Sequence, residues 1–262
     1  MQRFLFDNQY YMIRNGDFAT NANTKIIYGL VSTGLCINDY MNRNSSDCFV
    51  VLIGSTAVWS FVELMLHLSK TRNIKPMFII YGNNKKQLPQ SVGIILQGLQ
   101  EGGFITTLGL YYGDRLYETY YQIQLHMLIM LVVANIYTKT NRARSSKRQI
   151  NSVGTIACIG GITVYNMYMC YTHPEHIDRQ MSMFLVMVYV CSYWTFFTWY
   201  RGFRMIEVYE PQMIEENDNM NKQIQNYISY PANNWETFCV LAYDVIFEIG
   251  IAYVFFYNMC LV

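Results

Sequence analysis

Long stretches without a charged side chain constrain this chain most. A helix that crosses a bilayer needs about 20 largely apolar residues. Five segments of the chain meet that requirement: 48–69, 90–113, 150–172, 181–200 and 237–260. Charged residues make up 14% of the chain, well below the roughly 25% of soluble domains. The sequence therefore predicts an integral, multi-pass membrane protein.

Two further segments complete the predicted bundle. Residues 119–138 are slightly more polar than the first five segments. Residues 25–41 begin with an apolar run, which the polar Asn38 and Asp39 interrupt. This segment is therefore the least secure of the predicted spans. We expect an all-α transmembrane helix bundle with seven spans, and six spans remain an alternative.

The basic residues predict the orientation of the bundle. Loops 70–88 and 139–149 each carry five Lys or Arg residues and no acid, as cytoplasmic loops do. The N-terminus is then inside and the C-terminus outside. We expect a cytoplasmic N-terminal segment over 1–24 and a single transmembrane bundle over 25–262, with a cytoplasmic loop over 201–236 that extends the sixth helix.

Whole-chain charge and cysteine spacing exclude several function classes. The chain has 18 acidic and 19 basic residues, and this balance gives no reason to expect a nucleic acid partner. The seven cysteines form no C-x-x-C pair, so no metal site is indicated. Asp114 and Glu118 lie at an expected external helix end, where solvation would account for both charges.

Ionisable residues inside the spans are candidate sites, because each costs a few kcal/mol at bilayer depth unless it is paired or hydrated. Glu63 and His67 are four residues apart on one helical face, where each can satisfy the other. Asp244 and Glu248 have the same spacing. Two close carboxylates repel, so we expect one to be protonated or the pair to be matched by a cation.

A polar stripe marks the third predicted span. Gln97, Gln100 and Glu101 are followed directly by Gly102 and Gly103. No surface that faces lipid would tolerate this stripe, so it is expected to face the bundle interior. The glycines would let a neighbouring helix or a ligand approach the backbone closely.

The chain resembles heliorhodopsins, the inverted-orientation relatives of microbial rhodopsins, over the helical core in outline. Residues 101–107 look like that family's counter-ion acid followed by small and hydroxylated residues, and His67 resembles a pocket histidine. Residues 242–243 and 250–253 can be laid along the family's final helix. In that register Glu248 takes the place of the lysine that binds retinal.

This missing lysine separates the chain from the family's chemistry. None of the eight lysines is central in a predicted span, whereas a retinal Schiff base needs such an amine. No cofactor is expected, and covalent retinal binding should be absent. The resemblance implies instead that Glu101 faces Glu248 as an acid pair, which would titrate as a coupled unit and carry protons.

These observations favour a protonatable intramembrane site that serves proton or cation passage or ligand sensing. Its candidate residues are Glu101, Glu248, Asp244, Glu63, His67, Gln97 and Gln100. One alternative is a non-catalytic structural subunit of a membrane assembly, organellar or virion, with homo-oligomer or complex partners. Another is an intramembrane lipid-modifying enzyme, although a non-enzymatic role is favoured.

Overall fold

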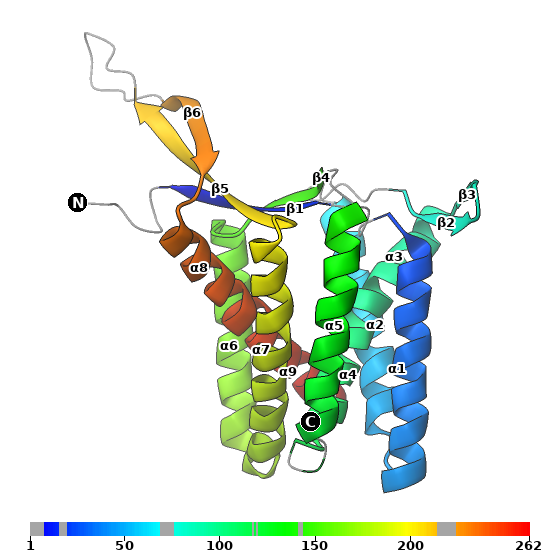
Figure 1. The fold of residues 1–262 in the computed structure, drawn as a ribbon. Coiled ribbons are helices and arrows are strands. Elements are labelled where there is room, and N and C mark those ends of the chain that lie inside the picture. Colours follow the sequence, from blue (N-terminus) through cyan, green and yellow to red (C-terminus); the bar gives the residue numbers. More distant parts are fainter. Residues whose placement is uncertain are drawn as a thin grey trace.

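The computed structural model describes residues 8–15, 20–68, 76–116, 118, 120–140, 144–213 and 224–262. The described residues are mostly helical, and their helices form seven rods packed side by side (Figure 1). The rods are α1 (Ala22–Arg43), α2 (Asp47–Leu68), α3–η1–α4 (Gln90–Gly98, Leu99–Phe104, Ile105–Gly113), α5 (Tyr120–Thr140), α6 (Val153–Thr172), η2–α7 (Pro174–His176, Ile177–Tyr200) and α8–η3–α9 (Asn234–Tyr243, Asp244–Ile251, Ala252–Leu261).

Four of these rods are long and apolar enough to cross a membrane. They are α2, α6, η2–α7 and α8–η3–α9, which correspond to four of the five strongest predicted segments. The fifth segment, 90–113, is helical throughout but is divided by the π-helix η1. The four long apolar helices indicate an integral membrane protein.

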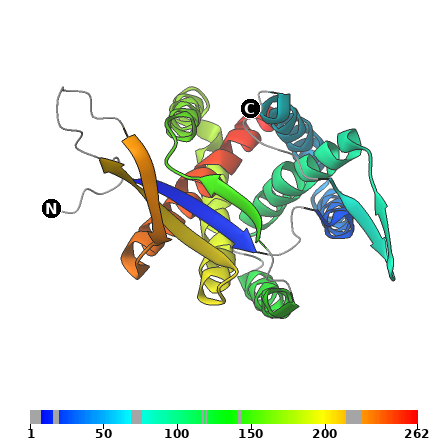
Figure 2. The ribbon, with the colours of Figure 1, turned by 90° about the horizontal axis from the view of Figure 1, so that it is seen from above.

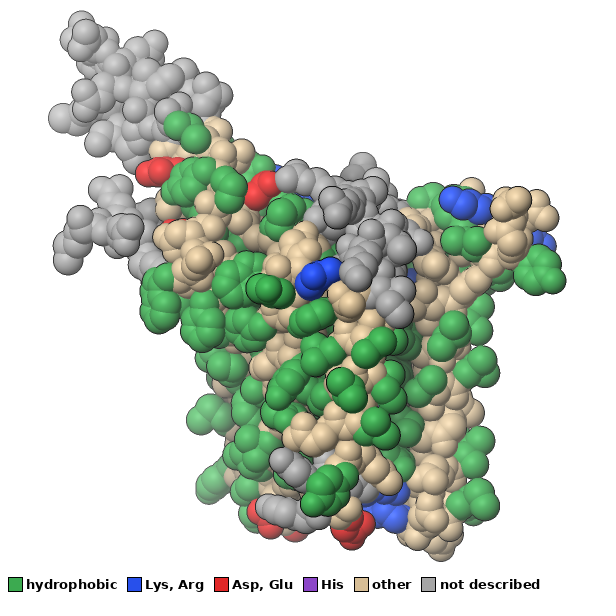
Figure 3. Space-filling view, viewed as in Figure 1, with side chains coloured by type: hydrophobic (Ala, Val, Ile, Leu, Met, Phe, Trp, Pro, Cys, Tyr) green, Lys and Arg blue, Asp and Glu red, His purple; other side chains and the backbone are tan. Residues whose placement is uncertain are grey.

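The outer face of the bundle is apolar. Only 11% of the apolar window of α6 is buried against the rest of the chain, and Val164, Met167 and Tyr171 are largely exposed. Figure 3 shows apolar side chains over the middle of one face of the molecule and charged side chains towards its ends. A surface of this kind is typical of helices in contact with lipid.

A four-stranded antiparallel sheet, which the all-α prediction missed, covers one end of the bundle (Figures 1 and 2). Its order is β4-β1-β5-β6. The strands are β1 (Gln9–Asn15), β4 (Arg144–Gln149), β5 (Arg204–Met213) and β6 (Ile224–Pro231). A separate hairpin is made of β2 (Phe78–Tyr81) and β3 (Asn84–Gln87). The all-α prediction is therefore wrong at this end.

The predicted helical extension after the sixth span is also wrong. Helix α7 ends at Tyr200, and Gly202 adopts a φ of 70°, a conformation that favours glycine at helix ends. The chain then enters β5, where Ile206 and Val208 are buried at every second position. They join Leu241 of α8 in a second hydrophobic core between sheet and bundle.

The connections alternate between the two ends of the bundle. Strand β1, the β2–β3 hairpin, β4 and the β5–β6 hairpin all lie at one end, and the C-terminus lies at the other (Figure 1). This end, called the sheet end below, gathers the described parts of the loops that are predicted to be cytoplasmic.

Glycines bring η1 against α2. A Cβ on Gly102 would lie 2.3 Å from the Ser55 carbonyl oxygen, and one on Gly103 would lie 2.2 Å from Thr56 Oγ1. Gly98, one helical turn earlier, is equally close to α2. Small residues four apart allow helices to meet backbone to backbone, so the predicted close neighbour of these glycines is a helix, α2.

We predict that Gly102→Ala destabilises the fold by about 1–3 kcal/mol, because its Cβ would force two backbones apart. Unfolding by SDS in detergent micelles measures the loss. Gly160→Ala is the matched control, because a Cβ at this helical position meets nothing within 4 Å. It should leave stability unchanged or raise it by up to about 1 kcal/mol. Equal stabilities of the two variants would contradict close α2–η1 packing.

Candidate functional site

Two acids of the last rod meet an arginine that comes from the sheet. Arg148 of β4 places Nη2 3.0 Å from Asp244 Oδ1 and 2.5 Å from Glu248 Oε2. The two acidic side chains are 3% and 6% exposed, whereas that of Arg148 is 45% exposed. Arg148 is a cation matched to this carboxylate pair, which is one of the two alternatives that the spacing of the acids predicts, and it links the pair to the surface.

A second arginine approaches the same acids from β5. Arg204 Nη1 lies 3.0 Å from Asp244 Oδ2 and donates to Thr195 Oγ1 at 3.0 Å. Burial, together with the nearby charge of Arg14, lowers the pKa of Arg204 to about 10 despite Asp244. Burial alone would also lower the pKa of Arg148, but the carboxylates outweigh it and raise that pKa. Arg148 is therefore the more firmly charged partner.

The cluster keeps polar atoms without hydrogen bonds. Both carboxylate oxygens of Glu248, the hydroxyl of Tyr243 and Nε of Arg204 are buried and have no hydrogen-bond partner among the described residues. Arg148 thus meets Glu248 as an ion pair without hydrogen-bond geometry. Buried polar atoms are normally satisfied, and of the two Glu248 oxygens only Oε2 has a charged neighbour, Arg148 at 2.5 Å.

Glu101 binds a side chain of the second rod. Its carboxylate Oε2 accepts a hydrogen bond from Trp59 Nε1 at 3.2 Å. No hydrogen bond joins Glu101 to Glu248 among the described residues, and the facing acid pair that the resemblance implies stays a prediction. Arg148 feels the charge of Glu101 as well as those of Asp244 and Glu248, so the three acids share one arginine electrostatically.

Both groups of acids stand on π-helices. Glu101 belongs to η1, and Asp244 and Glu248 belong to η3. A side chain of another rod binds a backbone carbonyl in each: Tyr253 donates to Glu101 O at 2.5 Å, and Asn166 donates to Ile251 O at 2.8 Å. π-turns inside α-helices are frequent at functional sites, and here each is fixed by a neighbouring rod.

The glutamines of the stripe meet a lysine instead of the acids. Lys25 is fully buried at the start of α1, and its Nζ donates to Gln97 Oε1 at 2.7 Å and to Gln100 Oε1. The stripe faces the bundle interior, as predicted. The sequence analysis missed the burial of Lys25, because a lysine at the start of a span ordinarily reaches water.

Glu63 and His67 complete the set of predicted residues. Glu63 is buried, with 2% of its surface exposed. His67 Nε2 lies 2.6 Å from Gln90 Nε2, and its Nδ1 is buried without a hydrogen-bond partner. His67 therefore links α2 to the first turn of α3, with which it shares the sheet end of the bundle.

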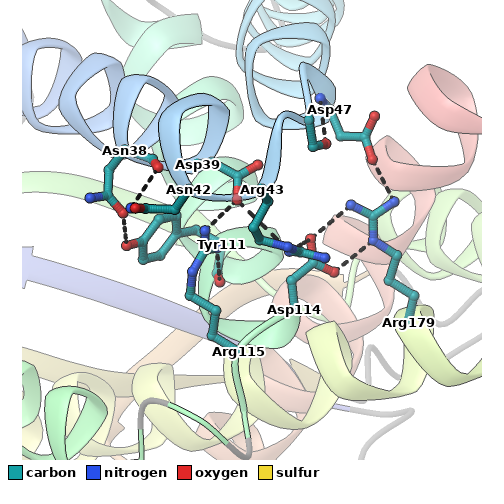
Figure 4. Close-up of polar contacts among 10 residues, drawn as sticks. Asn38, Asp39, Asn42, Arg43, Asp47, Tyr111, Asp114, Arg115 and Arg179 are labelled. Atoms are coloured by element: carbon teal, nitrogen blue, oxygen red, sulfur yellow. Dashed lines mark hydrogen bonds and ion pairs between the residues drawn. The ribbon is translucent and has the colours of Figure 1, made fainter.

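A separate network of charges lies at the end of the bundle opposite the sheet (Figure 4). Arg115 donates to Asp39 at 2.5 Å. Arg179 binds both oxygens of Asp114, at 2.6 and 2.7 Å, and Arg43 lies 2.7 Å from the same carboxylate. Asp114 is 3% exposed, so its predicted solvation is wrong: ion pairs from α1 and α7 satisfy it. The buried Asp39 likewise explains why α1 continues past its polar residues.

Comparisons with protein families, curated proteins and solved structures find no match to this chain. The resemblance to heliorhodopsins stays a prediction that the sequence motifs alone carry.

We predict that Arg148→Met destabilises the protein by about 2 kcal/mol, because it leaves two buried carboxylates without their shared cation. Thermal unfolding in detergent measures the loss. Lys147→Met is the matched control on the same strand. Lys147 lies 4.0 Å from Glu207 and over the rings of Tyr11 and Tyr209, and losing these exposed contacts should cost about 1 kcal/mol. A smaller effect at Arg148 than at Lys147 would contradict the role of Arg148.

At the opposite end, Asp114→Asn should cost about 3 kcal/mol, because it leaves two arginines facing a neutral group. Glu118→Gln, at an exposed position four residues away, should change stability by less than about 0.5 kcal/mol. Both are measured by SDS unfolding. If both substitutions changed stability equally and by little, solvent and not the arginines would account for the charge of Asp114.

Proposed function

We propose that all seven rods cross a bilayer, with the sheet end in the cytoplasm. Helix α1 has 22 residues and α5 has 21, and at 1.5 Å per residue each reaches about 30 Å, the thickness of the hydrocarbon core. The residues that lower the hydropathy of α1, Lys25 and Asp39, are buried against partners inside the bundle. The basic sequence of the sheet-end loops supports this orientation.

We further propose that the cluster of Arg148, Asp244 and Glu248 is a protonatable site that serves proton or small-cation passage. The observation that supports this proposal is the buried Glu248 carboxylate, whose Oε2 lies 2.5 Å from Arg148 and whose Oε1 has no partner among the described residues. Its ion-pair partner among the described residues, Arg148, extends to the surface at the sheet end. Arg148 itself stays protonated, and because its side chain is 45% exposed, water beside the guanidinium carries the proton to the Glu248 carboxylate.

Glu101 is the second proton acceptor in this proposal. It lies within electrostatic reach of Arg148, half-buried on the third rod, and its backbone is tied to the last rod by Tyr253. A charge change at Glu248 alters the potential at Glu101 through their shared arginine. Coupling of this kind is what a pair of sites needs to hand on a proton.

Reconstitution into liposomes with an internal pH-sensitive dye tests this function. Under an imposed membrane potential we expect proton flux above that of empty liposomes, and Glu248→Gln and Glu101→Gln should each lower it at least tenfold. Glu175→Gln, an exposed acid at the opposite end, is the matched control and should leave flux unchanged. The proposal is wrong if wild-type flux equals the empty-liposome background, or if the two interior variants behave like the control.

A structural subunit of a membrane assembly is the second candidate, and one feature of the sheet favours it. Strand β6 is an edge strand, and its Tyr227, Ile228 and Tyr230 are each more than a third exposed. Exposed apolar edge strands pair readily with other chains. Native mass measurement after gentle solubilisation distinguishes the candidates: a stable complex supports the subunit, and a monomer with flux supports the proton site.

A further inference from the structure

The β2–β3 hairpin projects sideways from the sheet end, beyond the outer side of α1 (Figures 1 and 2). A two-residue turn joins its strands, with Gly82 at a φ of 56°, a positive value that such turns require. The hairpin covers none of the second core, which lies under the four-stranded sheet. Its position therefore calls for a partner outside the protein.

Hydrogen bonds hold the hairpin at the level where α1 begins. The Asn23 side chain donates to Ile80 O at 2.6 Å and accepts from Ile80 N at 3.2 Å, as a neighbouring strand would. Phe78 N donates to Thr20 O at 2.9 Å. The hairpin is thus fixed at the helix ends, which is where the headgroup layer of a bilayer lies if the rods span it.

The two strands differ in chemistry. Strand β2 is apolar, with Phe78, Ile79 and Ile80 half-buried and Tyr81 84% exposed. All four residues of β3 are exposed, including the two central lysines, Lys85 and Lys86. Tyrosine rings favour the membrane interface, and exposed lysines beside it attract anionic headgroups.

No acidic residue offsets these lysines in the surrounding sequence. Between Glu63 and Glu101 the chain carries Lys or Arg at five positions and Asp or Glu at none. The hairpin is therefore a fixed, purely basic projection at headgroup level. Figure 3 shows its basic side chains at the upper right, beside apolar ones.

We propose that this hairpin binds the anionic phospholipid surface of the membrane in which the bundle sits, with Lys85 and Lys86 on headgroup phosphates and Tyr81 at the interface. This inference rests on the bilayer placement under the proposed function, but not on proton flux. If the protein inserts into the bilayer but conducts no protons, the inference about the hairpin still holds.

Native mass spectrometry of the full-length protein in detergent tests the inference, with phosphatidylglycerol and phosphatidylcholine titrated separately. We expect the first phosphatidylglycerol to bind at least fivefold more tightly than phosphatidylcholine. The double variant Lys85→Gln/Lys86→Gln should reduce this preference at least threefold. Lys85→Arg/Lys86→Arg keeps the charge and should preserve it.

Two controls locate and identify the ligand. Arg201→Gln removes an exposed cation at the same end and should leave the preference unchanged. An excess of inorganic phosphate should not displace the lipid. Equal binding of the two lipids by the wild type, an unchanged preference in the glutamine double variant, an equal loss in Arg201→Gln, or displacement by phosphate would each overturn the inference.

Discussion

Charge matching between buried carboxylates and arginines organises both ends of this bundle. A buried carboxylate without a cation costs several kcal/mol in a low dielectric, and this chain places acids on the inner faces of four rods. At the sheet end, Arg148 and Arg204 come from strands to meet Asp244. At the opposite end, Arg179 and Arg43 meet on Asp114. The ion pairs thus fix which rods and strands lie together.

The same constraint explains why a mostly helical membrane chain carries a sheet. Arg148 and Arg204 reach the last rod because β4 and β5 lie in one sheet over its first half. The apolar face of that sheet, with Ile206 and Val208, packs on α8. The sheet therefore both neutralises the acids and covers them, and it leaves Arg148 as their route to water. The carboxylates beneath this cover are shielded from water, apart from the exposed side chain of Arg148 beside them.

Sequence reasoning predicted the helical rods because the absence of charge over 48–69 or 150–172 is a local signal. It also predicted a close neighbour at Gly102, because glycine has no side chain to hold another backbone away. It missed Arg148, because Arg148 is one of five basic residues in the loop 139–149. These residues were used together, to predict the orientation of the bundle, and not one by one. It missed β5, although the apolar Ile206 and Val208 alternate with Glu207, because Glu207 and the acids that follow it resemble a solvated loop. Asp114 pairs with Arg43 and Arg179, which are far from it in the sequence. Nothing in the residues next to Asp114 indicates these partners.

A double-mutant cycle between Arg148 and Glu248 tests the central claim most directly. The free energy of unfolding is measured in detergent for the wild type, Arg148→Met, Glu248→Gln and the double variant. If Arg148 holds the buried carboxylate, the two substitutions are coupled by about 1–3 kcal/mol, and the double variant is more stable than the sum of the single losses predicts. Strict additivity would mean that the two side chains do not meet, and the charge-matching account would fail.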